Sequence, residues 1–326
     1  MQSFEYANPS SVQEAVGLLG ARWGQADVLA GGTDLISLMK QDLNAPKRVV
    51  NIKNVKELEG IRKTADGGLR IGAIVTMDEL ARNADVLAGY KSLADAAGGI
   101  PSPQIRHMGT VGGDLCQRPR CWYYRHGFGL LAMKDGKSLV PDGENQYHAI
   151  FGNGPAYFVS ASSLGPALVA LGARVKLVSA KGAREVPVAR FFVAPRDENT
   201  REIALLPNEI LSEILIPAGA THSATYEVRQ KEALDWPLVA AAVALTMKGA
   251  AVASAKVVLG HVAPTPHEAV AAERALTGKT ITTASAEAAG KAAAEGAQPL
   301  SQNAYKVTLV KTAVKRALLQ AAKQKA

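Results

Sequence analysis

The chain has 326 residues and a net charge of +8, with 48% hydrophobic residues, 30 glycines and 16 prolines. This length predicts two or three domains, and the apolar content excludes a disordered protein. No apolar run reaches the roughly 18 residues of a membrane span, so none is predicted. Two cysteines are too few for a disulfide framework, which favours a reducing compartment.

The basic residues are scattered along the chain rather than gathered in one block. A dispersed positive excess is typical of a soluble protein or of contacts with acidic partners, so we predict no nucleic-acid binding. The alternative is a basic nucleic-acid-binding protein. It would use the run RPRCWYYR, where Trp122, Tyr123 and Tyr124 stand between arginines and could stack on bases.

The first half of the chain alternates short strands with short helices. Val28–Ala30 is predicted as a strand, followed by a glycine turn and a helix of about two turns. The runs RVVNIKNV and LRIGAIVT predict two further strands. Thr76 and Glu79 form a capping-box pattern ahead of the helix MDELARNA. This succession indicates an α+β fold.

The periodic pattern is lost over residues 116–162, for which no regular element is predicted. It returns in LGPALVALGARVKLVSA as a helix and a strand, and in NEILSEILIP, whose isoleucines alternate as in a strand. Beyond residue 218, two apolar β-like runs meet at Gly249, and the helical stretches PHEAVAAERAL, SAEAAGKAAAEGA and NAYKVTLVKTAVKRALLQAA follow. We therefore place a domain boundary near residue 218.

Two glycine pairs carry the pattern of an anion-binding turn. In LAGGTDL, a predicted strand leads into Gly31 and Gly32, which let an anion approach open backbone N–H groups, while Thr33 offers a hydroxyl. GTVGGDL repeats the arrangement, with Thr110 ahead of the second pair. Either turn alone is also compatible with a tight turn that binds nothing. Together they can hold one long diphosphate ligand from both sides.

The order AGGTDLISLMK, LRIGA, TVGGDL, LPNEIL, GHVAPTP and NAYKVTLVK resembles the FAD-binding (medium) subunit of molybdenum hydroxylases. That family includes xanthine dehydrogenase, carbon monoxide dehydrogenase, aldehyde oxidoreductase and 4-hydroxybenzoyl-CoA reductase. The resemblance implies two α/β FAD-binding subdomains of the vanillyl-alcohol-oxidase type, at residues 1–58 and at 59–218 with the long loop 116–162. It also implies a C-terminal domain at 219–326, with a three-stranded antiparallel sheet and helices.

The resemblance further implies that electrons pass from a molybdenum cofactor on a large subunit, through [2Fe–2S] clusters on a small subunit, to FAD in this chain and on to an external acceptor. The cofactor carries the chemistry, so no nucleophile or acid–base pair is expected here. Ile100 and Leu211 would lie near the flavin ring, and the two glycine loops on the diphosphate. The implied FAD contacts are Leu29, Ala30, Gly31, Gly32, Thr33, Asp34, Leu35, Ile100, Thr110, Val111, Gly112, Gly113, Asp114, Ser163 and Leu211.

Two positions depart from the family pattern. Ser163 stands where many relatives have an aspartate that contacts FAD. Glu227 stands where some have a lysine near the flavin, with Lys231 close by in sequence. An acid beside the flavin disfavours its anionic reduced form and lowers its potential. An alternative is therefore a structural subunit of the same complex, with weak or lost FAD binding.

Cys121 lies where the aldehyde oxidoreductase branch places the first of four cysteine ligands of an extra [4Fe–4S] cluster. The other three places fall approximately on Leu131, Val140 and Ala156, and one thiolate cannot hold such a cluster, so none is expected in this chain. Cys116 and Cys121 are interpreted as small buried residues or plain thiols.

The run of aromatic and arginine residues after Cys116 is interpreted, given the resemblance, as loop packing or a contact with a partner subunit. The N-terminus MQSFEYANPS lacks the pattern of a secretion signal, which predicts a cytoplasmic protein. The alternative is a periplasmic location, reached with a partner that carries its own signal.

Overall fold

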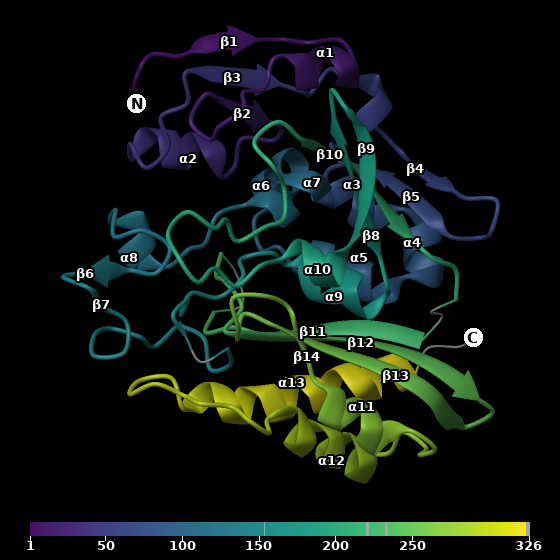
Figure 1. Ribbon diagram of the computed structural model, residues 1–326. Helices are drawn as coiled ribbons and strands as arrows, with labels where there is room; N and C mark the ends of the chain where they lie inside the picture. Colours follow the sequence, from purple (N-terminus) through teal and green to yellow (C-terminus); the bar gives the residue numbers. More distant parts are fainter. Residues whose placement is uncertain (153, 220–221, 232–233, 324–326) are drawn as a thin grey trace.

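The computed structural model describes residues 1–152, 154–219, 222–231 and 234–323. Figure 1 shows three sheets one above another, from the N-terminal sheet at the top to the C-terminal sheet near the bottom, with helices between and below them. This arrangement confirms the predicted mixture of α and β elements.

The N-terminal sheet has three parallel strands in the order β1–β3–β2. β1 spans Glu5–Ala7, β2 spans Ala26–Leu29 and β3 spans Arg48–Asn51. The strand predicted at Val28–Ala30 therefore begins two residues earlier, at Ala26, and ends at Leu29. Ala30 already belongs to the glycine loop. Helices α1 (Val12–Gly17) and α2 (Leu35–Lys40) connect the strands.

The middle layer is a five-stranded antiparallel sheet in the order β4–β5–β10–β8–β9. Its central strand, β10, comes last in the sequence and confirms the strand predicted from NEILSEILIP. The strands are β4 (Ile61–Lys63), β5 (Leu69–Gly72), β8 (Arg174–Ser179), β9 (Gly182–Pro187) and β10 (Ile210–Ile216).

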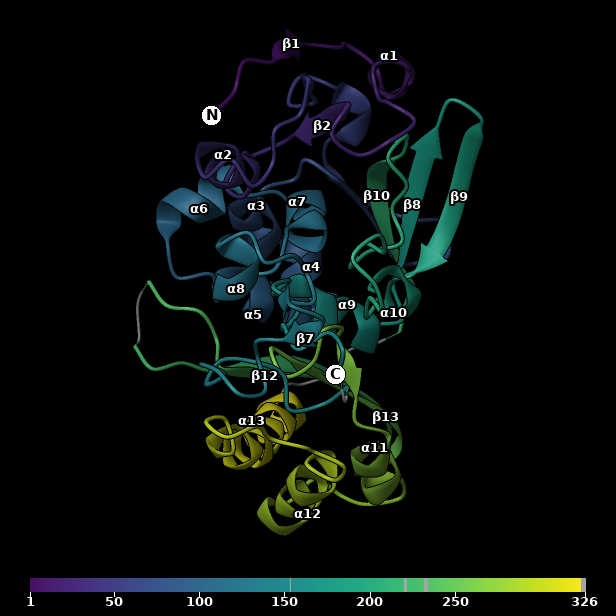
Figure 2. The same cartoon turned by 60° about the vertical axis from the view of Figure 1, so that its left-hand side comes forward.

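Short helices cover this sheet, and most of them share its hydrophobic core (Figure 2). The capping box is confirmed: the hydroxyl of Thr76 accepts from the backbone N–H of Glu79 at 3.2 Å, and the Glu79 carboxylate accepts from that of Thr76 at 2.7 Å. The helices are η1 (Lys56–Leu58), α3 (Met77–Arg82), α4 (Ala84–Gly89), α5 (Lys91–Gly98), α6 (Pro103–Met108), α7 (Val111–Cys116), α9 (Leu164–Ala170) and α10 (Val188–Phe191).

The prediction that residues 116–162 hold no regular element was wrong. The segment contains α8 (Trp122–Arg125) and a small hairpin of β6 (Met133–Lys134) and β7 (Lys137–Ser138). These pieces are too short to produce a periodic pattern, and glycine turns with positive φ separate them. They fold around a separate apolar cluster formed by Leu130, Leu131, Ala156 and Phe158.

The prediction of a three-stranded C-terminal sheet was also wrong, because four antiparallel strands pair in the order β11–β12–β13–β14. The fourth, His267–Glu268, has two residues and follows two prolines, so it gives no strand signal. The predicted helix PHEAVAAERAL begins only at Val270. The elements are β11 (His222–Val228), β12 (Val239–Lys248), β13 (Ala251–Gly260), β14 (His267–Glu268), α11 (Val270–Leu276), α12 (Thr283–Ala293) and α13 (Tyr305–Ala322).

The C-terminal sheet is covered on both faces. α11, α12 and α13 share a core with one face, while α5 and α9 pack from the middle layer. β12 reads VAAAVAL at its start, and these seven residues are all buried. Small side chains suit a strand that has neighbours on both sides. Among the described helices, none is both long enough and apolar enough to cross a membrane.

Candidate cofactor-binding site

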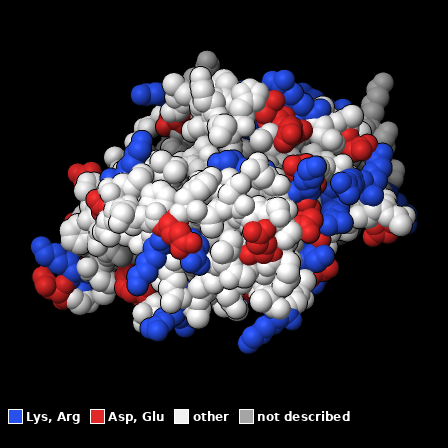
Figure 3. Space-filling model, turned by 90° about the horizontal axis from the view of Figure 1, so that it is seen from above, with Lys and Arg blue, Asp and Glu red and all other residues white. Residues whose placement is uncertain are grey.

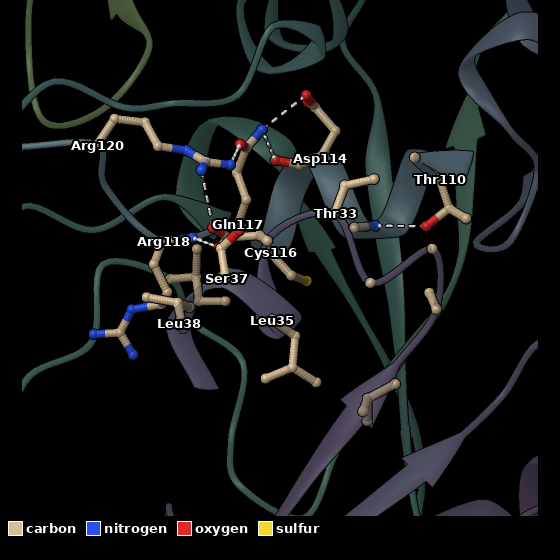
Figure 4. Close-up of a pocket in the computed structure, with 18 of the residues that line it drawn as sticks. Thr33, Leu35, Ser37, Leu38, Thr110, Asp114, Cys116, Gln117, Arg118 and Arg120 are labelled. Carbon is tan, nitrogen blue, oxygen red and sulfur yellow. Dashed lines mark hydrogen bonds and ion pairs between the residues drawn. The ribbon is translucent and has the colours of Figure 1, made fainter. Parts of the chain in front are cut away.

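A cavity of about 870 Å³ lies where the N-terminal sheet, α6, α7 and the segment 198–209 meet. This volume falls within the range of about 300–1,000 Å³ found for cofactor pockets. Of the predicted contacts, those that line it are Ala30, Gly31, Gly32, Thr33, Asp34, Leu35, Ile100, Thr110, Gly113, Asp114 and Ser163. Figure 4 shows part of this wall.

The first glycine loop connects β2 to α2 and leaves its backbone donors open. Gly32 has a φ of +74°, which glycine adopts without strain. Within the part of the chain that the structure describes, the N–H groups of Gly31, Gly32 and Thr33 have no hydrogen-bond acceptor. A loop with three open donors in a cavity is suited to bind an anionic group.

The second glycine loop differs from the expectation that it, too, offers open N–H groups. Val111 donates to Val75 O at 2.8 Å, Gly112 to Ala73 O at 2.9 Å and Gly113 to the Thr110 hydroxyl oxygen at 3.1 Å. Val111 is fully buried, and a Cβ on Gly112 would lie 2.9 Å from that of Ala73. These two residues therefore position α7, and neither lines the cavity.

The two glycine loops touch each other, which makes them parts of one site. A Cβ on Gly31 would lie 1.7 Å from the carbonyl oxygen of Met108, directly ahead of the second loop. Only a residue without a side chain allows this approach. Leu29 and Leu211, two further predicted contacts, are buried in the hydrophobic core and do not line the cavity. Ile100 lines it.

Asp34 and Asp114, both predicted contacts, bind protein donors. The Asp34 carboxylate accepts from the backbone N–H of Arg118 at 2.7 Å and pairs with the guanidinium groups of Arg125 at 2.9 Å and Arg120 at 3.1 Å. The Asp114 carboxylate accepts from the backbone N–H groups of Ser163 at 3.2 Å and Leu164 at 3.0 Å, and from the Ser162 hydroxyl.

Gln117 links the two acids, because it donates to Asp114 and accepts from Arg120 (Figure 4). Burial raises the pKa of Asp114. These contacts tie both glycine loops to the segment that follows α7.

Sequence reasoning missed the wall beside the N-terminal sheet. Arg201 lies over the Trp23 ring at 4.1 Å, and Asn44 donates to the carboxylate of Asp27 at 2.8 Å. Burial raises the pKa of Asp27. All four residues line the cavity, as do Arg120, Arg229 and Trp236. They come from segments far apart in the chain, and no motif signals them.

The aromatic run packs within the protein. The Trp122 indole donates to Glu144 O at 3.2 Å, and the Tyr123 hydroxyl accepts from Glu144 N at 2.8 Å. Arg118 lies over the Tyr124 ring at 5.2 Å. None of the three aromatic residues is exposed. On the face shown in Figure 3, basic and acidic residues are interspersed. These observations support loop packing for this run.

The four positions at which relatives hold the [4Fe–4S] cluster do not form a four-thiolate site in this chain. Cys121 packs against Leu131 and Ala156, so three of the four predicted places lie together, filled by apolar side chains, and Val140 is buried as well. Burial raises the pKa of the Cys121 thiol and raises that of Cys116 to about 12. In the described residues no group of three or more His, Cys, Asp or Glu could hold a metal ion.

A second cavity of about 220 Å³ shares Arg120 and Trp236 with the first. His148, whose ring nitrogen lies 3.1 Å from the Cys121 sulfur, and His261 both line it. Burial, helped by the charge of Lys306, lowers the pKa of His148 to about 4 and that of His261 to about 3. Both rings are therefore neutral near pH 7.

The buried histidines predict a loss of stability in acid. An unfolded chain protonates them at their ordinary pKa of 6.5, but the folded chain resists protonation down to about pH 4 and about pH 3. The unfolded state thus binds more protons in this window, so the free energy of unfolding decreases as pH falls below 6.5.

The histidine prediction is checked by urea unfolding above and below pH 6.5. His261→Asn, which suits the φ of +61° at this position, is expected to flatten the pH dependence. His107→Asn, at an exposed histidine, is the control. Parallel curves for the wild type and His261→Asn contradict the prediction.

The comparisons with known proteins agree with this geometry. The profile of the family described as the FAD binding domain in molybdopterin dehydrogenase matches residues 2–219, and that of the CO dehydrogenase flavoprotein C-terminal domain matches residues 224–321. This chain belongs to the FAD-binding subunits of molybdenum hydroxylases. As a member of this family it is an oxidoreductase subunit, which confirms the family inferred from the sequence.

Two curated relatives of this FAD-binding subunit span its whole length. It is 32% identical to the carbon monoxide dehydrogenase medium chain of Hydrogenophaga pseudoflava, over 97% of this chain and 96% of that one. It is 29% identical to the aldehyde oxidoreductase FAD-binding subunit PaoB of Escherichia coli K12, over 99% and 100%. A solved structure of carbon monoxide dehydrogenase from H. pseudoflava superimposes with a TM-score of 0.77 at 31% identity, covering 100% of this chain and 99% of that one.

Proposed function

We propose that this chain is the electron-transfer flavoprotein of a heterotrimeric molybdenum hydroxylase. A large subunit would hold the molybdenum cofactor and a small subunit the [2Fe–2S] clusters, while this chain would bind FAD and pass electrons to an external acceptor. When bound, FAD supplies the redox chemistry, and the protein binds it, orients it and tunes its potential.

The first glycine loop supports this proposal most strongly. The three residues whose N–H groups lack an acceptor line a cavity of about 870 Å³ and lie against the second loop, so a diphosphate would find donors without any lysine. The Thr33 and Thr110 side chains add hydroxyls at the same wall. The residues present therefore fit a dinucleotide such as FAD.

The subdomain type, the domain bounds and the location of the protein are proposed from the family resemblance. We keep the vanillyl-alcohol-oxidase type for the two FAD-binding subdomains at 1–58 and 59–218, and a separate C-terminal domain at 219–326. The pairing of β10 with β5 and β8 supports a second subdomain that runs to about residue 218. We also propose a cytoplasmic location, with export on a signal-bearing partner as the alternative.

Two positions favour the alternative of a structural subunit with weak FAD binding. Ser163 lines the cavity with a shorter, uncharged side chain in place of the family's aspartate. The side chain of Glu227 is only 8% exposed and packs on Gly99, next to Ile100. Neither residue blocks the cavity, and the open first loop is intact.

Purification of the chain with its partner subunits separates the two functions. We expect a yellow complex that releases about one FAD per chain on denaturation, and an apoprotein that regains the flavin when FAD is added. A colourless complex that cannot be reconstituted with FAD would exclude the electron-transfer function and favour the structural subunit. Iron analysis of this chain alone is expected to find no cluster, and about four irons per chain would contradict that part of the proposal.

A further inference from the structure

The segment Gly99–Ser102 is held by two arginines, and its last three residues line the cavity. Arg229 donates to the carbonyl oxygen of Gly99, and Arg106 donates to that of Ile100 at 2.5 Å. Both are charge-assisted hydrogen bonds to backbone that is otherwise a loop between α5 and α6. The two arginines differ in one respect, because Arg229 lines the cavity and Arg106 does not.

Arg229 is itself fixed by Glu227, two residues earlier on β11. Its guanidinium pairs with the Glu227 carboxylate, and the two side chains are only 17% and 8% exposed. A Cβ on Gly99 would lie 2.6 Å from the Glu227 carboxylate and 3.1 Å from the Arg229 guanidinium, so the pair packs directly on this glycine. The Arg229 Nε has no partner among the described residues, although it is buried.

The other arginines of the cavity lie elsewhere on its wall. Arg120 pairs with Asp34 of the first glycine loop at 3.1 Å, and Arg118 pairs with Glu202 at 2.7 Å. Arg201 lies over Trp23 of the N-terminal layer. Among the arginines that line the cavity in the described residues, Arg229 is therefore the one that binds the segment Gly99–Ser102.

We propose that Arg229 presents its positive charge to the ring of bound FAD, and that Glu227 is a positioning residue that holds it there. The proposal rests on the proposed function, in which Ile100 lies at the ring end of the cofactor. This proposal reverses the sequence-based expectation that the acid at Glu227 lowers the potential of the flavin. The acid lies beneath an arginine that lines the cavity, so the ring would meet a cation, which favours the anionic reduced flavin.

The charged groups around Glu227 influence its protonation, and therefore the pH range in which its negative charge offsets that of Arg229. From α5, Asp95, paired with Lys91, and from α7, Asp114 add negative charge near its carboxylate, while Arg316 of α13 binds the neighbouring Tyr226. Burial raises the pKa of Glu227 to about 7. Glu227 therefore carries most negative charge above pH 7, where it offsets Arg229 most.

The test compares the two arginines that hold the same segment. Arg229→Gln and Arg106→Gln are prepared as the complete complex with FAD, and the two-electron potential and the FAD dissociation constant are measured. Arg229→Gln is expected to lower the potential by about 30 mV, a tenfold loss of preference for reduced over oxidised flavin. Arg106→Gln is expected to shift the potential far less, because Arg106 does not line the cavity. Arg229→Lys is expected to retain the wild-type potential, because the charge remains.

Glu227→Gln gives an independent readout. We expect it to raise the potential above pH 7, where the wild-type carboxylate is charged, and to match the wild type below that pH. If Arg229→Gln binds FAD with an unchanged potential, or if Arg106→Gln shifts it equally, the role of Arg229 is overturned while the proposed function stands. A wild-type complex that binds no FAD overturns both.

Discussion

Gly31→Ala is expected to weaken FAD binding by about ten- to hundredfold, because about 1–3 kcal/mol of overpacking falls on the contact between the two glycine loops. The new methyl group would lie 1.7 Å from the Met108 carbonyl oxygen. That oxygen belongs to the backbone and cannot rotate away as a side chain could. The loops must separate, and the three open N–H groups move with them.

Equilibrium titration of the apoprotein with FAD, followed by flavin fluorescence, measures this effect. Gly17→Ala is the matched control, since a Cβ at Gly17 of α1 meets nothing within 4 Å. It is expected to leave FAD affinity unchanged and to add slightly to stability, as alanine does within a helix. Equal affinities for the wild type and Gly31→Ala would show that the loop contact does not shape the site.

Lys306→Met is expected to lower the free energy of unfolding by about 2 kcal/mol or more, because the carbonyl oxygens of Tyr147 and His261 lose their donor, while that of His148 keeps only the Asn303 amide. The Lys306 ammonium donates to the carbonyl oxygens of Tyr147 at 2.8 Å, His148 at 3.1 Å and His261 at 2.9 Å. The side chain is almost completely buried, and burial lowers its pKa to about 7. One side chain thereby joins α13, the segment 116–162 and the end of β13.

Urea unfolding of the purified protein checks the Lys306 prediction. The control is Lys315→Met on the same helix, where the lysine side chain is 34% exposed and pairs with Glu287 at 2.6 Å. A surface pair of this kind contributes about 0–1 kcal/mol. Similar losses of stability from Lys306→Met and Lys315→Met would mean that the carbonyl groups of Tyr147 and His261 bind water in place of the lysine.

The sequence predicted those parts of the site that depend on local backbone. Gly31 and Gly32 signal their turn because only glycine allows the positive φ and the close approach found there. The strand at Ile210–Ile216 and the capping box at Thr76 were equally recognisable. Each of these features depends on residues within a few positions of one another.

The sequence could not predict groups that only the tertiary fold brings together. Trp23 and Arg201 stack although they are far apart in the chain, and Arg229 reaches Gly99 from the end of β11 in the C-terminal sheet. Motif residues can also serve packing alone, as Val111 and Gly112 do in the second loop. The hydrophobic pattern also gave no signal for β14, because this strand has only two residues.

The position of β10 constrains how the chain can fold as it leaves the ribosome. Its residues lie between β5 and β8, which emerge well before it. The hairpins β4–β5 and β8–β9 each have a free edge until β10 arrives, and free edges invite pairing with other chains. A chain released before residue 210 would lack this strand. Such a truncated product is aggregation-prone, and the FAD site can be completed only at a late stage of synthesis.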